Sequence, residues 1–106
     1  MADGSVGPDG IRVRHGAEIE IVVAWDDIDA IARRKRAVEG RPPQSTTDAD
    51  GGVILHLPVQ DATAIDIVLA RPLDVRLSQR AETITEVRLA VDEPRAFFEA
   101  ARPYLT

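Results

Sequence analysis

Apolar residues recur at every second position along most of this chain, and this spacing limits the fold more than any other feature of the sequence. Ile19, Ile21 and Val23 fall on one side of an extended segment, with Glu20 between the first two. A repeat of two is typical of strands that bury one face. The same repeat predicts a mainly β molecule because it returns in five further segments: residues 10–14, 53–57, 65–69, 73–77 and 87–91.

The end of the chain has a different repeat. Between Asp92 and Arg102, the apolar side chains of Phe97 and Ala101 are four residues apart and share one face of a helix. Asp92 is a suitable N-cap, and Pro94 is tolerated in the first helical turn. One helix after a series of strands predicts a small curved sheet that this helix closes.

Size and composition set further bounds. A chain of 106 residues is long enough for one domain, which we place at residues 10–106 after a flexible N-terminus at residues 1–9. No cysteine is present, which removes thiolate chemistry and cysteine-based zinc sites. The sequence has no signal-peptide core and no apolar run near the roughly 20 residues that span a bilayer, so we expect a cytoplasmic protein.

The net charge of −5 argues against nucleic acid as a partner. It also argues against strong membrane binding by this chain alone, because nucleic acids and acidic membranes both repel such a field. Arginine supplies almost all of the positive charge, and Lys35 is the only lysine. This composition is typical of genomes rich in G and C, including those of actinobacteria.

Residues 27–39 allow two interpretations. As a helix, the segment would have Asp26 as its N-cap and Gly40 as its C-terminal stop. As a strand, it would follow a bulge, and Ile28 would re-enter the core. The helix would bury few apolar side chains, so we favour a strand over residues 28–36 and keep an α+β fold with a helix at 27–39 as the alternative.

Residues 40–52 are rich in proline, glycine and aspartate, and we expect a loop. Within this loop, Asp48 and Asp50 resemble the middle of a calcium-binding sequence. The likeness fails at both ends, because Thr46 stands at the first ligand position and Leu57 at that of the terminal glutamate. We therefore expect a turn there.

The step Trp25-Asp26-Asp27-Ile28-x-x-Ile31 resembles the entry into the third strand of bacterial pleckstrin-homology-like (PH-like) domains. Such domains include short versions at the ends of actinobacterial membrane proteins. The resemblance implies a bent antiparallel barrel of about seven strands with one C-terminal α-helix, and no enzymatic activity. It also implies that a membrane-anchored parent protein would hold the domain at the cytoplasmic face of the membrane.

Basic residues are concentrated at one place, the run Arg33, Arg34, Lys35 and Arg36, with Arg41 nearby. Such a run could bind a phosphate, an acidic lipid headgroup or an acidic peptide. The competing interpretation is a solvated face that neighbouring aspartates balance. These five residues are the candidate binding site.

No group of residues indicates catalysis. His15 and His56 lie far apart and neither has the spacing of a metal ligand, and the chain contains no glycine-rich phosphate loop and no nucleophile-elbow sequence. We therefore expect no catalytic residue, no metal and no cofactor. We place His56 on the outer face of a strand and Trp25 in the core.

The expected function is protein interaction or regulation without enzymatic activity, with a partner protein or a second copy binding at an exposed strand edge. Binding of an anion or an acidic lipid headgroup through the basic run is the first alternative. The second is a small-molecule pocket between the sheet and the C-terminal helix, beside Trp25 and Phe98.

Overall fold

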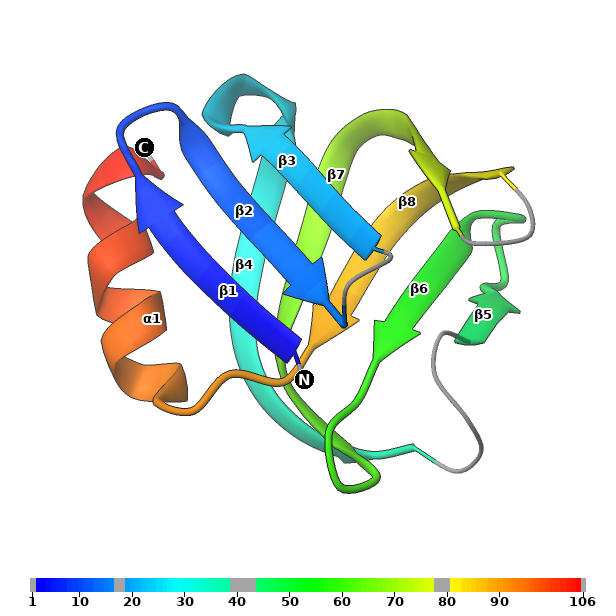
Figure 1. Cartoon of the computed structure of the whole chain (residues 1–106). Coiled ribbons are helices and arrows are strands. Elements are labelled where there is room, and N and C mark those ends of the chain that lie inside the picture. Colours follow the sequence, from blue (N-terminus) through cyan, green and yellow to red (C-terminus); the bar gives the residue numbers. More distant parts are fainter. Residues whose placement is uncertain (1, 17–18, 39–43, 78–80, 106) are drawn as a thin grey trace.

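Extended segments make up most of the chain in a computed structural model, which describes residues 2–16, 19–38, 44–77 and 81–105. One α-helix follows them near the end (Figure 1). The elements are β1 (Ala2–Gly7), β2 (Gly10–His15), β3 (Ile19–Ala24), the 3₁₀ turn η1 (Trp25–Asp27), β4 (Ile28–Ala37), β5 (Gln44–Thr47), β6 (Val53–Leu57), β7 (Ala62–Arg76), β8 (Ala81–Leu89), α1 (Pro94–Ala101) and the 3₁₀ turn η2 (Arg102–Tyr104).

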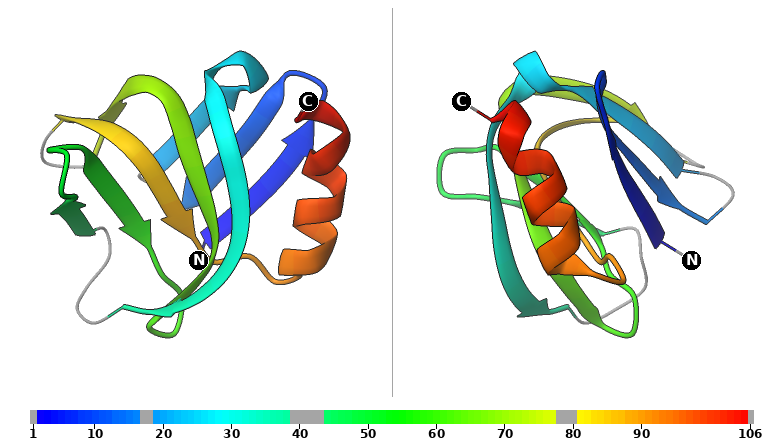
Figure 2. Two further views of the ribbon diagram at one scale, coloured as in Figure 1. Left: turned by 180° about the vertical axis from the view of Figure 1, so that it is seen from behind. Right: turned by 90° about the vertical axis from the view of Figure 1, so that its left-hand side faces the viewer.

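The strands form two sheets that face each other. One sheet has the order β1-β2-β3 and the other has the order β4-β7-β8-β6-β5. Helix α1 contacts both β1 and β4, so it lies where an edge of each sheet meets, as the right-hand view of Figure 2 shows. The prediction of a mainly β fold with one C-terminal helix is therefore confirmed.

The core lies between the two sheets and is built by the predicted alternation. Ile65 and Ile67 of β7 are fully buried, and so are Val87 and Leu89 of β8. Helix α1 adds Phe97 and Ala101, which are the buried residues of its inner face. Burial of these aliphatic side chains is the main source of stability, because the chain is poor in aromatic residues.

The strand interpretation of residues 28–36 is confirmed, and a helix at 27–39 is excluded. These residues form β4, which pairs antiparallel with β7. Ile28 and Ile31 of β4 reach the core cluster. Tertiary burial of these two side chains therefore outweighs the local helix signals of the segment.

Two strands were not predicted. Residues 2–7, which we had assigned to a flexible N-terminus, form β1 and pair with β2. Gly4 fits this strand against α1, since a Cβ there would lie 3.0 Å from Cε2 of the Phe97 ring. Residues 44–47, which we had assigned to a loop, form β5 and pair with β6.

Two further details differ from the prediction. The strands expected at 65–69 and 73–77 are one long strand, β7, whose register with β8 shifts between Val68 and Leu73. This irregularity accommodates Pro72, which has no amide hydrogen to donate to the ladder. The pairing of β6 with β8 is parallel, so the barrel is not antiparallel throughout.

The helix begins one residue later than predicted. Glu93, not Asp92, is the N-cap, and its side chain forms no capping hydrogen bond. The first backbone bond runs from the amide of Phe97 to the carbonyl of Glu93, at 3.0 Å. Among the described residues, no helix has the length and apolar content needed to cross a membrane.

Candidate functional site

The predicted basic run lies in the second half of β4, where pairing with β7 is irregular. Arg33 pairs with Ile65 and Arg36 pairs with Thr63, so β4 advances three residues while β7 advances two. This register shift is a β-bulge, which interrupts the alternation of side chains between the two faces of a strand. The cations of the run therefore have different surroundings.

Arg36 is tied to a buried carboxylate. Its Nη2 lies 2.9 Å from Oδ2 of Asp66, and its Nε lies 3.3 Å from the same carboxylate. Asp66 is 4% exposed, and Arg88 lies 3.8 Å from its other oxygen. The hydrogen bond to Asp66 raises the pKa of Arg36 above its ordinary value. Arg36 thus serves the fold and is not free to bind a ligand.

This ion pair belongs to a polar row that crosses the whole five-stranded sheet. His56, Arg88 and Asp66 are direct cross-strand neighbours on β6, β8 and β7. Each stands between buried aliphatic residues of its strand, so all three point to the face opposite the core. Arg36 of β4 completes the row at one end, and Thr46 of β5 completes it at the other, with its Oγ1 2.8 Å from Nε2 of His56.

His56 is on the outer face, as predicted, yet it is only 7% exposed. Burial lowers its pKa, and the neighbouring charge of Arg88 lowers it further. Its Nδ1 is buried and has no hydrogen-bond partner among the described residues. His56 is therefore a neutral structural residue near pH 7.

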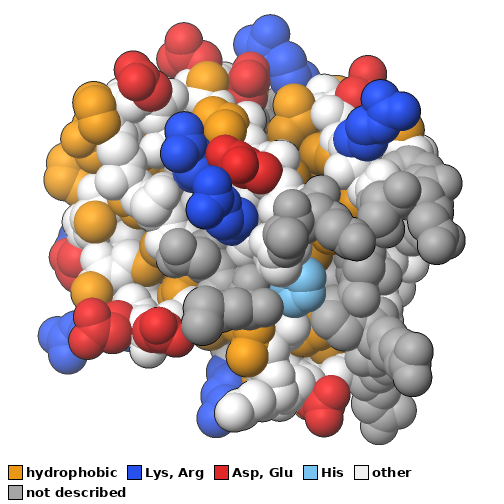
Figure 3. All heavy atoms as spheres, in the orientation of Figure 1, with side chains coloured by type: hydrophobic (Ala, Val, Ile, Leu, Met, Phe, Trp, Pro, Cys, Tyr) orange, Lys and Arg blue, Asp and Glu red, His pale blue; other side chains and the backbone are white. Residues whose placement is uncertain are grey.

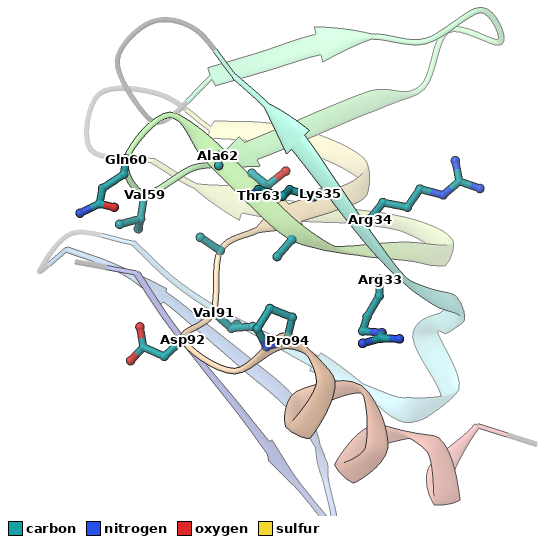
Figure 4. Close-up of a pocket in the computed structure, with 12 residues that line it drawn as sticks. Arg33, Arg34, Lys35, Val59, Gln60, Ala62, Thr63, Val91, Asp92 and Pro94 are labelled. Carbon is teal, nitrogen blue, oxygen red and sulfur yellow. The ribbon is translucent and has the colours of Figure 1, made fainter.

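A groove of about 670 Å³ lies beside the remaining cations, between β4, the start of β7 and the link from β8 to α1 (Figure 4). Alanines at three lining positions keep it open. The apolar lining consists of Val59, Ala62, Ala64, Ala90, Val91 and Pro94, and the polar lining consists of Arg33, Arg34, Lys35, Gln60, Thr63 and Asp92. The predicted residues Arg33, Arg34 and Lys35 are thus brought together at a concave surface, whereas Arg41 lies outside the described residues.

The three groove cations are exposed, and within the described part of the chain none of them takes part in a hydrogen bond or an ion pair. Several other arginines are neutralised. Arg12 and Arg14 both lie within 3.4 Å of Glu20, and Figure 3 shows basic and acidic side chains interspersed over that face. Unpaired like charges at a concave apolar surface favour an anionic ligand.

A second hollow, of about 400 Å³, lies at the other end of α1 beside Trp25. Trp25 is half-buried at the edge of the core, where it stacks on Tyr104 with ring centroids 4.6 Å apart. Its Nε1 donates to the carbonyl of Gly7 at 2.9 Å. Phe98, which we expected beside Trp25 at a pocket, does not line this hollow. The stack and this hydrogen bond together connect η2 to the end of β1.

The acidic motifs have structural roles. Oδ1 of Asp48 accepts hydrogen bonds from the amides of Asp50 and Gly52, which confirms the predicted turn between β5 and β6. Asp27 forms an ion pair with Arg71 at 3.1 Å. Across residues 2–16, 19–38, 44–77 and 81–105, no three His, Cys, Asp or Glu side chains are grouped in a way that could hold a metal ion.

Comparisons of the chain with protein-family models, with curated proteins and with solved structures found no match. A function can therefore be argued only from the geometry and charge of the residues themselves. Sequence reasoning found the cations of the groove but missed its other wall. Ala62, Ala64 and Ala90 carry no chemical signal in the sequence, and only the pairing of β7 with β4 brings the first two beside the basic run.

The basic run contains one structural cation, Arg36, and three that are free to bind a ligand. The free energy of unfolding of single variants tests this difference. Arg36→Ala leaves the buried Asp66 carboxylate with one distant partner, so we expect the free energy of unfolding to fall by about 1–3 kcal/mol. The matched control Arg34→Ala removes an unpaired surface cation, and we expect a change within about 0.5 kcal/mol. Urea unfolding followed by circular dichroism measures both variants, and equal losses would contradict this difference.

The buried His56 predicts a dependence of stability on pH. Its pKa is lowered in the folded state, so protonation favours the unfolded chain, and the contribution to stability is lost as pH falls from about 6.5 through the folded pKa. We expect wild type to lose more stability than His56→Gln between pH 7.5 and pH 5.5, in urea unfolding. His15→Gln measures the separate contribution of His15, because burial lowers the pKa of His15 as well. Identical pH profiles for wild type and His56→Gln would show that His56 does not titrate as described.

Proposed function

We propose that this chain is a non-enzymatic PH-like domain that binds an acidic segment of a partner protein in the groove beside β4. The observation that carries the proposal is the placement of Arg33, Arg34 and Lys35. In a chain of net charge −5, these three exposed cations lie together at a largely aliphatic groove and form no ion pair with any described residue. Charge complementarity of this kind steers and orients an acidic partner.

The fold is suited to a binding role because the groove borders rigid elements. β4 is held through β7 by the buried Asp66 pair, and α1 is fixed by Phe97 in the core. A binding surface on such a scaffold loses little conformational entropy when it takes up a ligand. The resemblance of the Trp25 step to PH-like domains points in the same direction.

The absence of catalysis is part of the proposal. Thr46 and His56 are the nearest approach to a nucleophile and a base, at 2.8 Å. Nδ1 of His56 has no carboxylate or other partner within the described structure to orient the ring, as a catalytic His would need. The residues that line the groove include neither Thr46 nor His56.

Acidic lipid headgroups are the second candidate ligand, because the same three cations would attract them. The exposed Val59 at the turn from β6 to β7, beside the groove, favours this candidate, since an apolar side chain next to cations could enter a membrane surface. The acidic character of the whole chain opposes it.

A direct test uses fluorescence anisotropy of a labelled peptide rich in Asp, Glu and aliphatic residues, titrated with the protein. We expect binding that weakens with salt and falls at least about tenfold in Arg33→Ala/Lys35→Ala, as loss of charge-assisted contacts predicts. Arg76→Ala/Arg102→Ala removes the same charge elsewhere and should bind nearly as wild type.

Co-sedimentation with phosphatidylcholine vesicles, with and without phosphatidylserine, separates the two ligands. Peptide binding without sedimentation supports the proposal. If the protein binds no peptide, and sediments only with vesicles that contain phosphatidylserine and only when the β4 cations are present, the ligand is an acidic lipid headgroup and the proposal is wrong. Equal loss of binding in the two double variants would show that net charge alone, and not the groove, attracts the peptide.

A further inference from the structure

We propose that the groove selects acidic segments in which a block of acidic residues adjoins a block of aliphatic residues, and that Arg33 is the residue that sets this preference. The inference rests on the proposed function and adds the pattern of the partner. It follows from the way charge and apolar surface are divided along the groove, and from the opposite directions of two neighbouring arginines.

The groove is electrically asymmetric. Arg33 and Asp92 lie at opposite ends of its lining, and Val91 and Pro94 lie between them (Figure 4). A carboxylate is attracted at the β4 end and repelled at the Asp92 end. The lining between these ends is mainly aliphatic, and a desolvated charge there would be costly. An occupant that is acidic at the β4 end and aliphatic along the rest meets the cations and avoids repulsion by Asp92.

The side chains of Arg33 and Arg34, the first two residues of the basic run, point in opposite directions. In Figure 4 the side chain of Arg33 extends from β4 toward α1, on the side where Pro94 lies, and that of Arg34 extends the opposite way. Both are exposed and unpaired within the described structure. Arg33 can therefore form a bidentate contact with a carboxylate in the groove, whereas Arg34 contributes only a nearby charge.

Strand addition is a poor alternative mode of binding. β4 is the outermost strand of its sheet, so its far edge could in principle accept another strand. It carries two register shifts, one after Ile28 and one after Arg33, and three consecutive exposed cations. Bulges and charges are the features by which edge strands avoid further pairing. Recognition by side chains in the groove is therefore favoured over backbone pairing along β4.

The test compares three labelled hexapeptides in the same anisotropy assay. One has three acidic residues followed by three aliphatic residues, one has the same residues in alternation, and one is entirely acidic. We expect the block peptide to bind at least about fivefold more tightly than the other two at physiological salt, where charge attraction alone is screened. Val59→Ser should weaken binding of the block peptide only, because Val59 belongs to the apolar wall.

Single variants give the second readout. Arg33→Ala should weaken the block peptide about tenfold, and Arg34→Ala, the matched control of equal charge, less than about threefold. Similar affinities for all three peptides, or equal losses in Arg33→Ala and Arg34→Ala, would overturn the inference and leave the proposed function standing. Failure of every peptide to bind the folded protein would overturn both.

Discussion

The buried carboxylate of Asp66 is the interaction on which the arrangement of charge in this protein depends. It is almost fully removed from water, so it needs cationic partners, and it draws Arg36 from β4 and Arg88 from β8. A buried charge without such partners would cost several kcal/mol. The pairing fixes the outer face of three neighbouring strands, and it also decides which member of the basic run is unavailable for binding.

The cations that Asp66 does not use define the binding surface. The register shift between Arg33 and Arg36 interrupts the alternation of side chains along the run, and the alanines at the start of β7 leave space beside the cations. The same short segment therefore serves two purposes. Its last residue stabilises the sheet, and the three before it present positive charge at an apolar groove in an otherwise acidic molecule.

The fold was predictable from sequence where the determinants are local. The alternation of Ile19, Ile21 and Val23 indicates a strand without knowledge of its neighbours, because burial of one face requires that spacing. β1 and β5 were not predictable in this way. Their residues are small or polar, and they become strands through pairing with β2 and β6, which depends on contacts distant in sequence.

The candidate site was predictable only in part. A run of cations is visible in the sequence. The pairing that removes Arg36 from the site cannot be predicted in this way, because Asp66 lies 30 residues further along the chain. The burial of His56 could not be predicted for the same reason. Its flanking leucines place it on the outer face, whereas its burial there follows from neighbours on the adjacent strands.

The central claim is that the residues beside β4 are a binding groove, and chemical-shift mapping tests it most directly. A ¹⁵N-labelled sample is titrated with the block peptide, and amide shifts are followed residue by residue. We predict that the largest changes fall at Arg33–Lys35, Ala62–Ala64 and Ala90–Asp92, with little change around Arg12 and Glu20. Changes centred on another face, or none at peptide excess, would contradict it.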